Sequence, residues 1–89
     1  MPTYVIGYDL NDPGQDYDDL FDAIKDYGTW WHHLDSTWII RTTDSASEIR
    51  DNLKQYKDSN DELLVVKLSV TWASSGINSD GADWLHDHL

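Results

Sequence analysis

The chain has 89 residues, enough for one small domain and too few for two, and 39% of them are hydrophobic. It contains no cysteine, which excludes disulfides, thiolate metal sites and a cysteine nucleophile, and its longest apolar stretch is far shorter than the ~20 residues of a membrane span. Seventeen acidic residues stand against six basic ones, so the formal net charge is -11; direct binding to a phosphate backbone, which depends on Lys and Arg, is disfavoured.

The first half of the chain predicts a strand, a helix and a hairpin. Residues 3–10 are β-branched and aromatic and predict a strand. Apolar residues then recur at helical spacing over 16–27, between the capping residue Asp16 and the stop signal Gly28. Residues 29–43 are too aromatic and β-branched for a helix, and Asp35 and Ser36 divide them into predicted strands at 29–34 and 37–42.

The second half predicts a helix, a strand and a tail. Ser45 and Glu48 fit a capping box, which predicts a second helix over 46–56. Residues 57–61 are a polar loop, 62–70 predict a fourth strand, and 82–89 predict a short last helix. This order predicts an α+β, ferredoxin-like βαββαβ fold, with a four-stranded antiparallel sheet and two helices on one face. We expect a single domain over 1–89, with a core at 1–70 and a C-terminal tail at 71–89.

The sheet face away from the helices is expected to need a cover. The strands predicted at 3–10 and 62–70 carry apolar side chains on both sides, whereas a sheet face in water is normally polar. The tail or a second subunit would provide the cover, and because two-fold dimers are the commonest oligomers, we predict a homodimer. The residues expected to pack against the tail or the second subunit are Tyr4, Ile6, Tyr8, Leu64, Val66, Leu68 and Trp72.

Asp9 is the candidate catalytic and metal-binding residue. It ends the first predicted strand after a hydrophobic run, and a carboxylate in that position can bind Mg²⁺ through oxygen. Two such carboxylates from two subunits would share a metal ion and activate water for phosphodiester cleavage. A structural interpretation stands beside this one, in which Asp9 caps the turn predicted at 11–14.

The acidic residues between 9 and 26 are offset only by Lys25. They are interpreted either as a solvated helix face or as an acidic docking strip. For the whole chain, three explanations stay open: adaptation to salt, a surface for a basic protein, or mimicry of nucleic acid. His32 and His33 are adjacent on a predicted strand, so their side chains should point to opposite faces. The five tryptophans are expected in the core and in dimer packing.

Four segments follow one another in an order known from one superfamily: the strand ending Tyr8-Asp9-Leu10, the helix ending Tyr27-Gly28, and the stretches 35–40 and 60–68. In this order, residues 1–68 resemble the CRISPR-associated protein 2 superfamily. The resemblance is to its SinR-like stand-alone branch, with virulence-associated protein D as a more distant relative.

The resemblance implies a ferredoxin-like homodimer. It matches Asp9 to the aspartate to which Mg²⁺ or Mn²⁺ binding and nuclease activity are assigned in some members, while other members are non-catalytic scaffolds. It gives Ser36 and Trp38 a structural role. Members that hold duplex DNA carry basic surfaces, and this chain does not.

Three functions are therefore expected. The first is a small dimeric interaction or scaffold module without strong catalysis. The second is a metal-dependent endonuclease that uses Asp9 from each subunit. The third is an acidic nucleic-acid mimic or inhibitor of a basic protein. Residues 1–10 lack the basic start and apolar run of a signal peptide, so a cytoplasmic location is expected.

Overall fold

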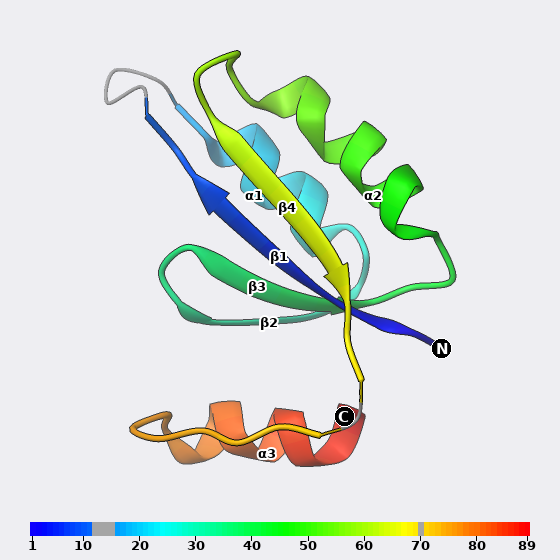
Figure 1. Ribbon diagram of the computed structural model, residues 1–89. Helices are drawn as coiled ribbons and strands as arrows, with labels where there is room; N and C mark the ends of the chain where they lie inside the picture. The colour runs from blue at the N-terminus through cyan, green and yellow to red at the C-terminus, as the bar shows by residue number, and fades with distance from the viewer. Residues whose placement is uncertain (12–15, 70) are drawn as a thin grey trace.

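The computed structural model describes residues 1–11, 16–69 and 71–89 and confirms the predicted fold class (Figure 1). The chain forms β1 (Thr3–Asp9), α1 (Asp18–Lys25), β2 (Thr29–Leu34), β3 (Thr37–Arg41), α2 (Ala46–Leu53), the 3-10 helix η1 (Lys54–Tyr56), β4 (Glu62–Lys67) and α3 (Ser79–His88). Neighbouring strands are antiparallel in the order β2-β3-β1-β4. This is the ferredoxin-like βαββαβ arrangement followed by a C-terminal helix.

Local signals set the ends of the first two helices. The Ser45 hydroxyl accepts a hydrogen bond from the backbone N–H of Glu48, and the Glu48 side chain accepts one from the backbone N–H of Ser45, so the predicted capping box is present. Gly28 follows α1 with a φ of 90°, which favours glycine. The Asp16 carboxylate accepts a hydrogen bond from the N–H of Asp18, where α1 begins, two residues later than predicted.

Several other boundaries differ from the sequence prediction by one to three residues, and two of the differences concern the C-terminal part of the chain. Helix α3 begins at Ser79 rather than at residue 82, because the Asn78 side chain caps it by accepting a hydrogen bond from the N–H of Gly81. Strand β4 ends at Lys67, before the predicted end at Val70, which lies outside the described residues. Residues 12–14 of the predicted turn lie outside them as well.

The larger hydrophobic core lies between the sheet and helices α1 and α2. Its buried members come from β1, β3 and both helices: Tyr4, Ile6, Tyr8, Leu20, Ala23, Ile24, Trp38, Ile40, Ile49 and Leu53. The prediction that Tyr4, Ile6 and Tyr8 pack against the tail or a second subunit was therefore wrong, whereas for Leu64 and Val66 it stays a prediction. In the β1–β4 register Ile6 lies opposite Val65, so Ile6 shares its face with Val65 and not with Leu64.

The C-terminal tail covers part of the opposite face of the sheet. Trp31, Ile39 and Leu85 are buried there, with Val5, Leu68, Trp72, Ile77, Trp84 and Leu89 packed around them. The indole N–H of Trp31 donates a buried hydrogen bond to the carbonyl of Gly81, 3.0 Å away, which ties β2 to α3. Figure 1 shows α3 lying apart from α1 and α2, across the sheet from them. In the described part of the chain, no helix has the length and apolar character to cross a membrane.

Candidate interaction surface along strand β4

Strand β4 lies at one margin of the sheet, and among the described residues it is paired only with β1. On the face that carries α3, its side chains are those of Glu62, Leu64 and Val66, opposite Asp9, Gly7 and Val5 of β1. Val5 packs against the tail, but Leu64 and Val66 belong to neither hydrophobic core. Their exposed fractions are 64% and 43%, so two neighbouring apolar side chains of this strand face water.

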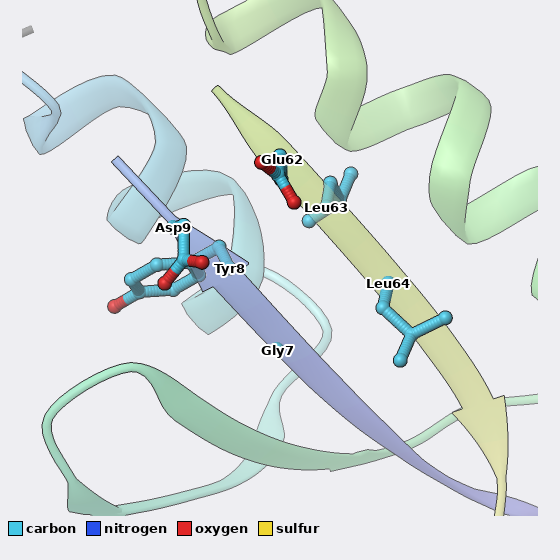
Figure 2. Close-up of a pocket in the computed structure, with 6 residues that line it drawn as sticks. All are labelled: Gly7, Tyr8, Asp9, Glu62, Leu63 and Leu64. Carbon is cyan, nitrogen blue, oxygen red and sulfur yellow. The ribbon is translucent and has the colours of Figure 1, made fainter. Parts of the chain in front are cut away.

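A hollow of about 440 Å³ opens beside these residues, at the end of β1 (Figure 2). It is lined by Gly7, Tyr8, Asp9, Glu62, Leu63 and Leu64, and it is called the β1–β4 groove below. A Cβ atom placed on Gly7 would meet nothing within 4 Å, so no side chain of the described residues fills the groove above this glycine. A second hollow, of about 240 Å³, lies on the helix side of β4 and is lined by Ala46, Ser47, Arg50, Leu63, Leu64 and Val65. The same strand thus borders open space on both of its faces.

The structure places the predicted site residue Asp9 in the β1–β4 groove, directly opposite Glu62. Both side chains are exposed, and Figure 2 shows them on neighbouring strands. Two carboxylates a cross-strand distance apart supply oxygen ligands of the kind that Mg²⁺ takes, together with water or phosphate. Among the described residues, no group of three or more acidic or histidine side chains is placed to hold a metal ion.

Asp61, at the entrance to β4, is a structural residue that the sequence prediction missed. Its side chain is only 4% exposed. One carboxylate oxygen accepts hydrogen bonds from the N–H of Asn11 at 2.7 Å and the hydroxyl of Tyr17 at 2.9 Å, and the other accepts one from the N–H of Asp58 at 2.9 Å. Burial acts to raise the pKa of Asp61, but these hydrogen bonds and the charge of Lys57 outweigh it, so the pKa is lowered.

The basic residues are gathered near β4 in the sequence. Five of the six lie between 41 and 67, where six acidic residues nearly balance them, whereas residues 1–40 hold eight acidic residues and only Lys25. Arg50 and Lys54, on α2 and η1, both pair with Asp51. The five acidic residues at 16, 18, 19, 22 and 26 are all exposed. The α2–β4 side of the fold is therefore close to neutral, and most of the excess negative charge lies elsewhere.

The histidines lie against tryptophans. His32 stacks on Trp38 with ring centroids 3.7 Å apart, and His33 contacts Trp31, so the two adjacent histidines point to opposite faces as predicted. The ring of His86 meets that of Trp72 edge-on, and the ring of His88 stacks on that of Trp84. Four tryptophans are buried or partly buried, and Trp30 is 39% exposed beside Lys25, whose ammonium lies 5.5 Å from its ring.

Comparison with known proteins adds no assignment: no protein-family model matches the chain, and no solved structure matches it. The resemblance to the CRISPR-associated protein 2 superfamily therefore stays a prediction from the residues quoted above.

Proposed function

We propose that this chain is a small interaction module that works as a homodimer, with the margin formed by β4 buried between two copies. The observation that carries this proposal is the exposure of Leu64 and Val66 beside the open side of an edge strand. Natural edge strands are usually protected by charge, proline or a covering segment, because an apolar edge invites pairing with another chain. Here α3 covers the β2–β3 side of the same face and leaves these two residues in water.

The near-neutral charge around β4 supports a second copy as the occupant. Two chains of net charge -11 repel each other, so they approach best through the side where acidic and basic residues balance. That is the α2–β4 side, with Arg50 and Lys54 next to Asp51.

The test is the effect of a charge on the exposed edge. Leu64→Lys should give a monomer at concentrations where the original chain is a dimer, because a lysine on an apolar edge opposes pairing. Leu34→Lys is the matched control: Leu34 is 48% exposed on β2, the other edge strand, and its substitution should leave the dimer intact. Sedimentation equilibrium measures both. If the original chain stays monomeric up to millimolar concentration, the proposed homodimer is contradicted.

A metal-dependent nuclease is the second candidate, because Asp9 and Glu62 share one face and border the same groove. These two residues would hold a Mg²⁺ or Mn²⁺ ion, which when bound supplies a Lewis acid and an activated water. The test incubates labelled RNA and DNA with the chain and either metal, beside Asp9→Ala and the remote control Asp51→Ala. Cleavage lost only in Asp9→Ala supports this candidate, and cleavage that persists in Asp9→Ala removes it.

A basic protein is the proposed partner of the module, because the acidic residues at 16, 18, 19, 22 and 26 are exposed on and next to α1. The attraction between an acidic surface and a basic one weakens as salt screens it. Titration with a lysine-rich peptide should therefore show binding at low KCl that fades at high KCl. Binding of equal strength at both concentrations would argue against an acidic docking surface.

A further inference from the structure

We propose that two copies pair β4 to β4, antiparallel and centred on Val65, so that their sheets join into one continuous sheet of eight strands. This inference rests on the proposed homodimer and specifies its geometry. The direction of the N–H and C=O groups of β4 favours the register centred on Val65. The exposed side chains of Leu64 and Val66 favour the same register.

The direction of the backbone groups follows from one hydrogen bond. The N–H of Leu68 donates to the carbonyl of Thr3, 2.9 Å away, so the backbone groups of Leu68 point toward β1. Backbone groups alternate in direction along a strand, so those of Glu62, Leu64 and Val66 also point toward β1. The free side of β4 therefore presents the N–H and C=O groups of Leu63, Val65 and Lys67.

A two-fold axis restricts the registers that these groups allow. When such an axis relates two antiparallel copies of one strand, the residue at the centre pairs with the same residue of the second copy. A residue one or two places before the centre pairs with the residue equally far after the centre in the second copy. Centred on Val65, the pairing matches Val65 with Val65 of the second copy, and Leu63 with its Lys67. Each of the three outward residues then donates a hydrogen bond through its N–H and accepts one through its C=O across the interface. Centred on Leu64, Lys67 would face Asp61, whose N–H already donates to the carbonyl of Asp58.

The exposed side chains select the same register. Centred on Val65, Leu64 lies opposite Val66 of the second copy, and Val66 lies opposite its Leu64. These are non-hydrogen-bonded pairs, in which side chains come closest. The two most exposed apolar residues of β4 are thus covered by each other. Centred on Leu64, Glu62 would lie opposite Val66 inside the interface, whereas centring on Val65 moves Glu62 to the end of the interface, opposite Leu68 and beyond the last residue of β4.

The helix side of β4 leaves room for the second strand. The hollow there is bordered by the small side chains of Ala46 and Ser47 and by the exposed, flexible Arg50. The second copy's Val65 and the aliphatic stem of its Lys67 would enter this space next to Leu63. On the other face, Val66 of the second copy would extend the wall of the β1–β4 groove beyond Leu64, so each groove is completed by both chains.

This geometry also separates the two Asp9 residues. Asp9 pairs with Glu62, three residues from the centre of the interface, and β1 lies one strand further from the axis. With strand rises of ~3.4 Å and strand spacings of ~4.8 Å, the two Asp9 residues lie roughly 25 Å apart. They could not share one metal ion. Any metal chemistry would then belong to the Asp9 and Glu62 of a single chain.

Val65→Pro tests the pairing. The N–H of Val65 points away from β1, so proline at this position removes no bond of the sheet inside the chain, and edge strands tolerate it. It removes the central donor of the proposed interface. Circular dichroism should show the strand and helix content of the original chain, and sedimentation should show a monomer. A folded Val65→Pro chain that still dimerises overturns the pairing.

Cysteine substitution tests the register, and it does so without background because the chain has no cysteine. A mixture of Leu64→Cys and Val66→Cys chains should form a disulfide-linked dimer on mild oxidation, because the two positions face each other. Either variant alone should form little, since equivalent positions lie about 8 Å apart, beyond disulfide reach. Cross-linking of Leu64→Cys with itself, together with the absence of a mixed Leu64→Cys/Val66→Cys dimer in the mixture, overturns the register but leaves the homodimer standing. A dimer that disappears in Leu64→Lys yet persists in Val65→Pro likewise separates the two proposals.

Discussion

At the scale of single residues, Asp61 joins three segments that are far apart in the sequence. Its carboxylate holds the backbone just after β1 through Asn11 and the start of α1 through Tyr17, which are 50 and 44 residues away. It also holds its own loop through Asp58. The sequence offered only an aspartate in a polar loop, and such residues are normally solvated. Partners at that separation become visible only once the sheet has brought β1 beside β4.

Asp61→Asn should lower the melting temperature by several degrees at neutral pH, because the amide loses the charge that the hydrogen bonds favour. The pKa of Asp61 is lowered in the fold, so its contribution to stability is complete above the unfolded carboxyl pKa, about 3.9, and is lost as pH falls through the lower folded pKa. The difference between the two chains should therefore shrink below about pH 4. Thermal melts across the acid range measure it.

Asp51→Asn is the control for this experiment. The pKa of Asp51 is also lowered, chiefly by its hydrogen bond with Arg50 and by the charges of Arg50 and Lys54. Its side chain is 53% exposed, however, and exposed ion pairs contribute little to stability. A loss of stability in Asp51→Asn equal to that in Asp61→Asn would contradict the special role given to the buried carboxylate.

Tyr8 is the second polar residue on which the core depends. Its hydroxyl accepts a hydrogen bond from the indole N–H of the buried Trp38 and donates one to the carbonyl of Asp35. Tyr8→Phe leaves the indole N–H without a partner and should cost about 1–3 kcal/mol of unfolding free energy, measured by urea denaturation. Tyr4→Phe is the control, because the hydroxyl of Tyr4 forms no hydrogen bond within the described residues. Equal losses in both variants would contradict this assignment.

At the scale of elements, local sequence signals predicted the helices and strands, whereas the pairing of distant strands determined which side chains are exposed on each face of the sheet. The capping box at Ser45 and the glycine stop at Gly28 are local, and both were predicted. The register between β1 and β4 decides which side chains of the two strands lie on the same face of the sheet. A shift of one residue would move every side chain of one strand to the other face. That is why Ile6 was grouped with Leu64 although it lies opposite Val65.

The docking of α3 depends on Gly81, which lies just before the predicted start of this helix at residue 82. A Cβ on Gly81 would lie 2.7 Å from Cγ2 of Ile77 and 3.0 Å from Cγ of His33. Gly81→Ala should therefore loosen α3 from the sheet by about 1–3 kcal/mol, although alanine favours the helix itself. Hydrogen exchange of residues 79–88 should become faster. Asp83→Ala, at an exposed position of the same helix, is the control and should leave exchange unchanged or slower.

At the scale of the whole molecule, charge and association are coupled. Each chain carries a net charge of -11, so a dimer gathers twice that charge, and the near-neutral α2–β4 side reduces the repulsion without removing it. Added KCl shortens the screening length from ~10 Å at ~0.1 M to ~3 Å at ~1 M. The dimer should therefore tighten as KCl rises, whereas an interface held by opposite charges would weaken.

The same reasoning separates association from adaptation of the single chain to salt. Repulsion among the acidic residues of one chain also falls with KCl, so the melting temperature of the monomeric Val65→Pro chain should rise with salt. The melting temperature of the original chain should rise more steeply, because dimerisation adds a stabilisation that grows as the dimer tightens. Melting curves of both chains over one KCl series, at one chain concentration, measure the two slopes. Equal slopes for the two chains would mean that salt acts only within the single chain. Melting temperatures that do not change with KCl in either chain would contradict the proposed role of charge repulsion.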